Sequence, residues 1–173
     1  LNEVGAEVSV GQAIGMRDET AAHNFATHNI TLSLIVSAGW ALILFSLAPF
    51  IIRFYELEQH IASDAINYLR IVSTAFPFVF MSAAFTGIFN AGGRSKIPFS
   101  INGIGLVINM ILDPLFIFVF DWKTDGAALA TWIAQACVFG LFVYHLKFKK
   151  ILWEDFRFFG RLKRLYTTKI IKI

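Results

Sequence analysis

A carboxylate lies inside an apolar stretch that is long enough to cross a lipid bilayer. The stretch covers residues 98–120, and its one ionisable side chain is Asp113, with Asn109 four residues before it and Pro114 directly after it. A charged side chain at the centre of a spanning helix costs about 2.5–3.5 kcal/mol on insertion scales, so such residues face a protein interior or a water-filled cavity. We therefore predict that Asp113 serves an ion or proton pathway.

The rest of the chain is similarly apolar. Of its 173 residues, 57% are hydrophobic and only 16% are charged, which lies outside the range of a soluble domain of this size. A spanning helix needs about 20 apolar residues, and four runs reach that length: 30–52, 71–91, 98–120 and 127–146. The predicted fold class is an all-α membrane protein, a polytopic bundle of transmembrane helices.

The two ends of the chain differ from these spans. Residues 1–14 carry Glu3 and Glu7 and are predicted to be the end of a helix whose start is missing, so we interpret the chain as an internal piece of a longer protein, with a bundle over 1–146. The two glutamates line a central cavity or lie near a membrane edge. Residues 147–173 alternate apolar residues with Lys and Arg at steps of three and four, which predicts a basic amphipathic interfacial helix. A solvated basic linker is the alternative.

Basic residues indicate the orientation. If the segments alternate across the bilayer, twelve of the 15 Lys and Arg residues fall on one side, in loops 15–29 and 92–97 and in the tail 147–173. That side is predicted to be cytoplasmic. The other three, Arg53, Arg70 and Lys123, fall on the opposite side. Because the basic tail adjoins a spanning helix, its predicted partners are anionic membrane lipids and not nucleic acid.

Polar side chains of the last two spans have matching depths. The loop 121–125 makes these spans antiparallel neighbours, and counting about 1.5 Å per residue from it pairs Asp113 with Thr131 and Asn109 with Gln135. Residues four apart share a helix face, so all four side chains can meet. Hydrogen bonds that only join the two helices would explain the three uncharged residues. The carboxylate favours a site for a coupling ion.

Other kinds of chemistry find no support in the sequence. The four His residues lack the spacing of metal ligands, and neither a catalytic triad nor a nucleotide-binding motif is present. We predict that the protein is not an enzyme, uses no cofactor and is not driven by ATP.

Four segments in series carry a family resemblance: GAEVSVGQAIGMRDETAA at 5–22, GIFNAGGRSKIPF at 87–99, INMILDPLFIF at 108–118 and GAALATWIAQ at 126–135. In this order and spacing they are similar to the amino-terminal lobe of the multidrug and toxic compound extrusion (MATE) family, in particular its prokaryotic DinF-like branch. The resemblance implies that the chain lacks the first helix and the whole second lobe, into which residues 147–173 would lead.

The resemblance also implies a function. Members of this family are secondary antiporters that export organic, often cationic, compounds in exchange for H⁺ or Na⁺. Their amino-lobe ion site combines an Asp of the first helix with residues that match Asn109, Asp113 and Thr131 here. Gln135, Glu3 and Glu7 are possible supporting polar residues from their positions alone. The implied partners are a small organic substrate, membrane lipids and the remaining helices of the full-length protein, and the implied location is the bacterial inner membrane.

Two alternative functions stay open. One is a flippase of lipid-linked oligosaccharides from the same superfamily, which would be expected to carry more basic residues along its cavity. The other is a non-transporting membrane scaffold subunit, in which Asp113 would need a fixed cationic partner. The four predicted spans contain no Lys or Arg to supply one.

Overall fold

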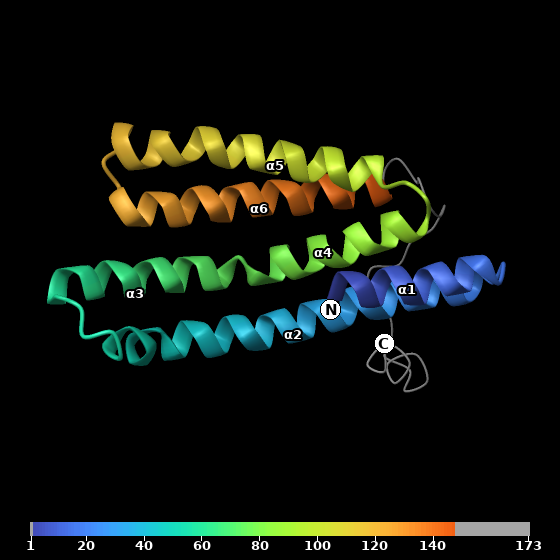
Figure 1. Cartoon of the computed structure of the whole chain (residues 1–173), viewed down its shortest axis with the longest axis horizontal. Coiled ribbons are helices and arrows are strands. Elements are labelled where there is room, and N and C mark those ends of the chain that lie inside the picture. The colour runs from blue at the N-terminus through green and yellow to red at the C-terminus, as the bar shows by residue number, and fades with distance from the viewer. Residues whose placement is uncertain (1, 148–173) are drawn as a thin grey trace.

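The computed structural model describes residues 2–147, which form helices joined by short turns. In chain order (Figure 1) the elements are α1 (Asn2–Gly15), α2 (Glu19–Arg53), α3 (Gln59–Thr74), α4 (Phe76–Ala91), α5 (Lys96–Pro114), the π-helical turn η1 (Leu115–Val119) and α6 (Lys123–Lys147). The interfacial helix predicted for 147–173 lies outside the described residues, apart from Lys147.

Helices of membrane-spanning length account for most of the chain. By length and composition α2, α6 and the continuous stretch Lys96–Val119 can each cross a bilayer, and α3 with α4 forms a fourth span that is bent by 41°. The predicted fold class, an all-α polytopic membrane protein, is confirmed. The predicted boundaries of two spans differ from those observed.

The first difference concerns the loop predicted for residues 15–29, which is wrong. Helix α2 begins at Glu19, where the Asp18 side chain caps it by accepting a hydrogen bond from the backbone nitrogen of Ala21 at 2.8 Å. Polar residues at 19–29 lower the local hydropathy, but Phe25 and Ala26 are buried there against other helices. Contacts with other helices stabilise these turns. Hydropathy detects segments that are apolar enough to face lipid, so it does not detect these turns.

The second difference lies in the bent span. The helix predicted for 71–91 begins earlier, at Gln59, and breaks at Ala75. Pro77 lacks a backbone N–H and its ring crowds the preceding turn, which accounts for the bend of the span. Arg70, which we expected near one membrane face, therefore lies inside the span. The prediction that the spans contain no basic residue is wrong for this position.

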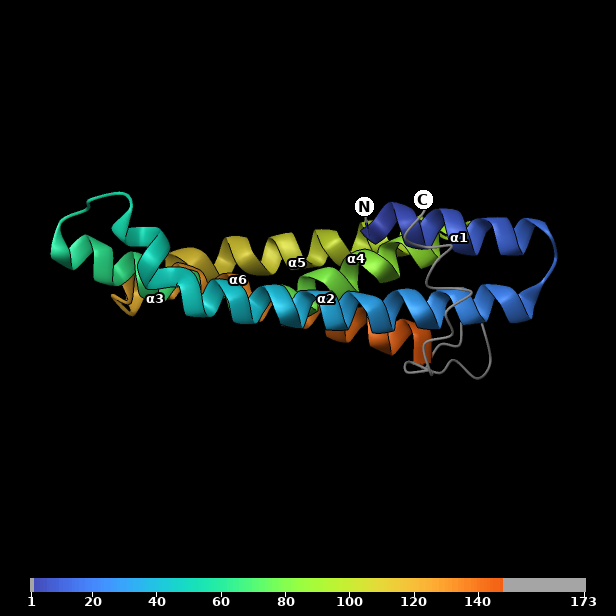
Figure 2. The same ribbon diagram turned by 90° about the horizontal axis from the view of Figure 1, so that it is seen from below.

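Helix α4 is the centre of the bundle. It contacts α1, α2, α3, α5 and α6. Figure 2 shows α1 and α5 on one side of the bundle and α2 on the other, and within residues 2–147 α1 and α5 do not touch each other. The α1–α2 and α4–α5 turns lie at one end, and the α2–α3 and α5–α6 connections lie at the other (Figure 1). The helices thus alternate in direction as the predicted topology requires.

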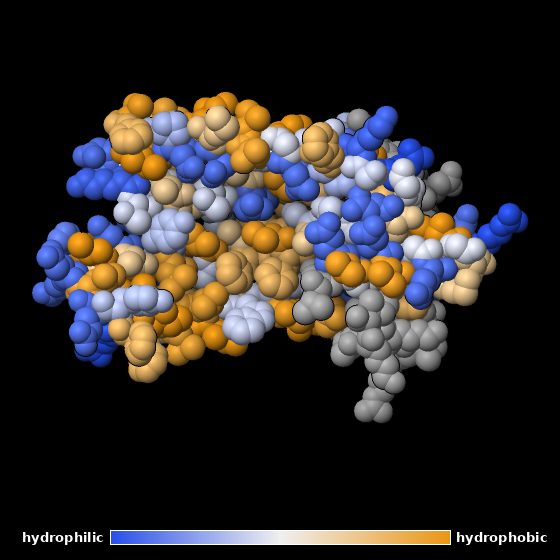
Figure 3. Space-filling view, viewed as in Figure 1, coloured by the Kyte–Doolittle hydropathy of each residue, from blue (hydrophilic) through white to orange (hydrophobic). Residues whose placement is uncertain are grey.

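Aromatic packing and close helix approach stabilise this arrangement. The buried ring of Phe142 on α6 lies 5.7 Å from that of Phe85 and 6.0 Å from that of Phe89, both on α4. At Gly87 an added Cβ would overlap the backbone oxygen of Glu3, so α1 packs directly on α4. Figure 3 shows an apolar surface with hydrophilic residues at both ends and, on the face in view, also between α5 and α1.

Candidate functional site

Helices α5 and α6 approach each other closely at a glycine. An added Cβ at Gly105 would overlap Cγ2 of Val138, so a larger residue at this crossing requires Val138 to move. At Gly103, on another face of α5, an added Cβ would meet nothing within 4 Å. The close approach brings the polar residues of the two helices within reach of each other.

Asn109 is the centre of the resulting polar cluster. Its Nδ2 lies 3.5 Å from Oδ1 of Asp113 and 3.5 Å from Oγ1 of Thr131, and it donates to both. All three residues are half-buried. The separations are long for hydrogen bonds, which leaves the carboxylate and hydroxyl oxygens able to accept another partner. The structure thus brings together the three residues that the sequence analysis selected.

The cluster borders a hollow of about 280 Å³ between α5 and α6. Thr131 and Gln135 line it from α6, and Asn109 and Asn102 line it from α5, together with Gly105, Leu106, Ala134 and Val138. Asn102 was not among the predicted site residues. Its position seven residues before Asn109, two helical turns along the same face, was the available signal.

The register between the two helices differs from the predicted one. We expected Asn109 opposite Gln135 and Asp113 opposite Thr131, but Asn109 reaches Thr131. The expected pairing counted depth along α6 from the end of a loop at 121–125, but α6 already begins at Lys123, which places Thr131 deeper than expected. The π-helical turn η1 adds a smaller shift in the same direction, because it winds more residues into each turn and so brings Asn109 closer to the α5–α6 connection.

The turn η1 begins directly after Pro114, where the α-helical pattern is interrupted. Pro114 has no N–H to continue the α-helical pattern, and the N–H of Phe120 bonds the carbonyl of Leu115 at 3.1 Å. Gly126 on α6 allows this turn to pack closely, because an added Cβ would lie 2.9 Å from the carbonyl carbon and oxygen of Phe116. Single π-helical turns inside helices are frequent at functional sites, and this one adjoins Asp113.

The remaining predicted site residues lie apart from the cluster. Glu3 and Glu7 are exposed on α1, which contacts neither α5 nor α6 within residues 2–147. The structure therefore does not bring them to Asp113. The same part of the chain contains no group of three or more His, Cys, Asp or Glu side chains that could hold a metal ion.

Asp113 has no cationic partner among the described residues. The one ion pair between their side chains joins exposed His60 and Glu58 at 3.7 Å. Arg70, the basic residue inside a span, contacts the ring of Phe45 instead. A half-buried carboxylate with amide and hydroxyl neighbours but no fixed counter-charge can accept a proton or contribute oxygen ligands to a small cation.

The fold and its polar cluster define a multi-pass helical membrane protein with an intramembrane carboxylate site. A family model described as MatE matches residues 3–115, more than half of the chain. The chain belongs to this family, the MATE transporters, as its four motifs predicted.

Two curated relatives of this chain are named as probable multidrug resistance proteins. The probable multidrug resistance protein YoeA of Bacillus subtilis (strain 168) is 27% identical over 150 residues, which cover 84% of this chain and 32% of that protein. The probable multidrug resistance protein NorM of Thermotoga maritima is 26% identical over 149 residues, or 82% of this chain and 31% of that protein. The chain thus spans about a third of the length of these relatives.

Solved structures match the fold. A multidrug resistance MATE family transporter of the MOP superfamily in an inward-facing conformation matches with a TM-score of 0.90 at 24% identity, covering 99% of this chain and 39% of that one. An outward-facing conformation described in the same words matches with a TM-score of 0.89 at 22% identity, covering 99% and 38%. The helices of this chain therefore have the same arrangement as one part of both conformations.

Proposed function

We propose that this chain forms most of the first lobe of a secondary active antiporter that exports organic, cationic compounds in exchange for H⁺ or Na⁺. The observation that carries the proposal is the contact of Asn109 with both Asp113 and Thr131 between two membrane-spanning helices. The multidrug names of the relatives support export of organic compounds. The bacterial inner membrane is the proposed location, with the α1–α2 and α4–α5 turns on the cytoplasmic side.

The cluster is suited to a coupling ion because no described residue compensates the charge of Asp113. Asp113, Asn109 and Thr131 offer carboxylate, amide and hydroxyl oxygens, which suit a hard cation, and the carboxylate equally suits a proton. Either ion neutralises Asp113 and removes the cost of keeping a bare charge between apolar helices. Gln135 and Asn102, which line the adjoining hollow, can orient water or the ion there.

Neutralisation can be converted into movement through the elements next to Asp113. Pro114 and η1 follow it directly, and η1 packs on α6 through Gly126. When the ion leaves, the charged carboxylate is stabilised by moving toward water and other hydrogen-bond donors. This favours a different packing of α5 on α6. The likeness of this chain to both inward-facing and outward-facing transporters supports a lobe that moves largely as one body while the ion biases its position.

The alternatives lack the features that they need. A flippase of lipid-linked oligosaccharides would need basic residues along its cavity, and the hollow beside Asn109 is lined by none. A non-transporting scaffold would need a cation against Asp113, and Arg70 on α3 contacts Phe45 instead. Further helices of the same protein, with a second acidic residue near Asp113, would complete the proposed site.

Ion flux in proteoliposomes tests the proposal. The full-length protein is reconstituted, and ethidium, an organic cation, is added while internal pH and ²²Na⁺ content are followed. An antiporter moves H⁺ or Na⁺ against ethidium, with protein-free liposomes as the control. Transport of a lipid-linked oligosaccharide without any ethidium-dependent ion flux would establish the flippase alternative instead.

A further inference from the structure

A second hollow, separate from the polar cluster, contains a basic side chain. This groove has a volume of about 390 Å³ between α2, α3 and α6 and is lined by Phe45, Arg70, Ile71, Thr74, Leu129 and Trp132. Apart from Arg70 and the hydroxyl of Thr74, its lining is apolar. An arginine in such surroundings inside a spanning helix needs an anionic partner.

No such partner occurs among residues 2–147. The guanidinium carbon of Arg70 lies 5.3 Å from the centre of the Phe45 ring, and its Nε is buried without a hydrogen-bond partner. No carboxylate of the described helices lies within 4 Å of its nitrogens, since the one ion pair there joins His60 and Glu58. A cation–π contact with one ring compensates part of the lost hydration, but it supplies no acceptor for the guanidinium N–H groups.

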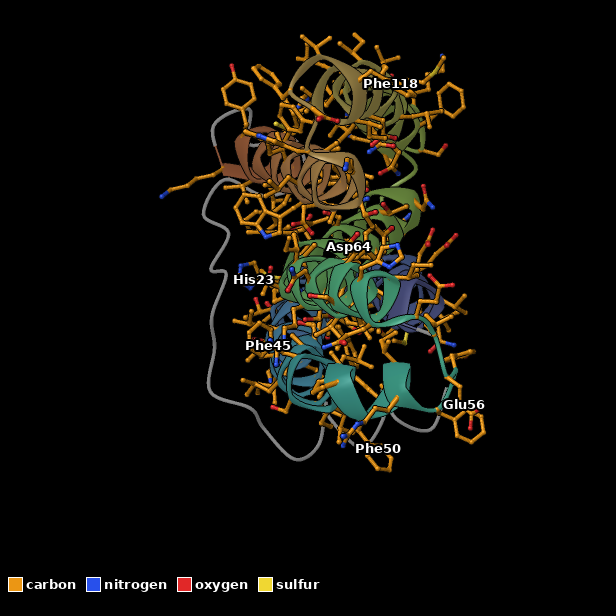
Figure 4. The ribbon with its side chains drawn as sticks, turned by 90° about the vertical axis from the view of Figure 1, so that its left-hand side faces the viewer. His23, Phe45, Phe50, Glu56, Asp64 and Phe118 are labelled. Atoms are coloured by element: carbon orange, nitrogen blue, oxygen red, sulfur yellow. The ribbon has the colours of Figure 1, made fainter. Side chains whose placement is uncertain are left out.

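The groove and the polar cluster lie on different flanks of α6. At 3.6 residues per turn, the mean direction of Thr131 and Gln135 lies about 110° around that helix from the mean direction of Leu129 and Trp132. Arg70 lines only the groove and forms no ion pair with Asp113. Phe45 is 44% exposed and lies on the flank of the bundle in Figure 4, so the groove opens outward.

The depth of Arg70 suits a lipid headgroup. It lies six residues after the exposed Asp64, which is about 9 Å further along the helix axis from the polar end of α3. Basic side chains at such depth extend toward the nearer membrane face, and phosphates with water descend locally to meet them. The nearer face is the one beside the α2–α3 connection.

We propose that this groove binds one phospholipid from the leaflet beside the α2–α3 connection. Its phosphate accepts hydrogen bonds from Arg70, and an acyl chain lies along Phe45, Leu129 and Trp132. A phospholipid supplies both the anion that Arg70 lacks and the apolar surface that the lining matches. The groove also opens toward the surrounding bilayer, which consists of such lipids.

Trp132 provides a local probe of occupancy. In the full-length protein every other tryptophan is changed to phenylalanine, including Trp40, Trp122 and Trp153. Quenching of Trp132 fluorescence is then measured with three brominated lipids: phosphatidylglycerol, phosphatidylcholine and diacylglycerol. We expect both phosphate-bearing lipids to bind roughly three- to tenfold more tightly than diacylglycerol, because charge-assisted hydrogen bonds are the strong ones.

Substitutions assign that preference to Arg70. Arg70→Gln should abolish it and Arg70→Lys should retain part of it. Arg53→Gln, at the exposed end of α2, should leave it unchanged. If Arg70 pairs with a carboxylate elsewhere in the protein, Arg70→Gln lowers thermal stability and leaves the lipid ratio unaltered, which overturns the proposal. The proposal is also overturned if the protein that retains Arg70 binds diacylglycerol as tightly as it binds the phospholipids.

Discussion

The amide of Asn109 on α5 joins Asp113 of its own helix to Thr131 of α6, at 3.5 Å to each oxygen. The contact fixes the observed register of the two helices and places beside a small hollow a carboxylate that has no cationic partner among residues 2–147. Most of the functional account depends on this geometry.

Crosslinking tests the register. In a background without the exposed Cys137, cysteines introduced by Asn109→Cys and Thr131→Cys should react rapidly with a short bifunctional reagent. The pair Ile111→Cys and Ile133→Cys should react much more slowly, since Ile111 is 60% exposed on another face of α5. Equal rates for the two pairs would show that α5 and α6 present other faces to each other.

Close approach at Gly105 is a second requirement of the site. Gly105→Leu should force α5 and α6 apart at Val138 and destabilise the protein by about 1–3 kcal/mol, as overpacking does. Gly103→Leu is the matched control, because the same change there meets open space and gains up to about 1 kcal/mol of helix propensity. Thermal unfolding in detergent measures both. A similar change in unfolding temperature for the two variants would contradict the proposed packing.

A buried polar contact between α1 and α2 should contribute to stability. Nδ2 of Asn29 donates to Oγ of Ser9 at 3.0 Å, and both side chains are nearly inaccessible. A double-mutant cycle of Asn29→Ala and Ser9→Ala should give a coupling energy of about 0.5–2 kcal/mol in unfolding measurements. The exposed Asn67 provides a control, since pairing Asn67→Ala with Ser9→Ala should give additive effects. Additivity at Asn29 would mean that this hydrogen bond contributes no stability.

The 173-residue chain alone should not transport. A cavity with alternating access needs two lobes, and this chain spans about a third of the length of its relatives. Reconstituted by itself, it should show no ethidium-dependent H⁺ or Na⁺ flux above that of empty liposomes. Robust counterflow from this chain would instead indicate a small transporter that assembles from several copies.

The sequence predicts the spans and the cluster where lipid and spacing determine the structure. Asn109 and Asp113 are four apart on one helix, and Thr131 follows a short connection, so helical geometry is enough to predict that they lie near each other. The starts of α2 and α3 were missed because these turns are polar and pack on protein or extend toward water. The apolar runs therefore begin later in the sequence than the helices do. For the same reason the predicted span 71–91 left out Arg70.

The finer register could not be predicted for a different reason. Pro114 indicates an interruption, but hydrophobic periodicity does not distinguish a π-helical turn from an α-helical one over five residues. That turn and the start of α6 at Lys123 together shift the partner of Asn109 from Gln135 to Thr131, one helical turn along α6. The glycines at 105 and 126 allow the close approach of the helices. Their role could not be predicted, because it depends on neighbours that only the fold brings close to them.

Asp113 itself provides the most direct test of the account. Full-length protein, wild type and variants at equal expression, is assayed for gradient-driven ethidium efflux in energised membrane vesicles. Asp113→Asn should reduce efflux to the background of vesicles without the protein, because a permanently neutral side chain cannot release and rebind the coupling ion. Asp64→Asn, which removes an exposed carboxylate from α3, should leave efflux unchanged. Wild-type efflux from a folded and inserted Asp113→Asn protein would contradict the coupling role of this carboxylate.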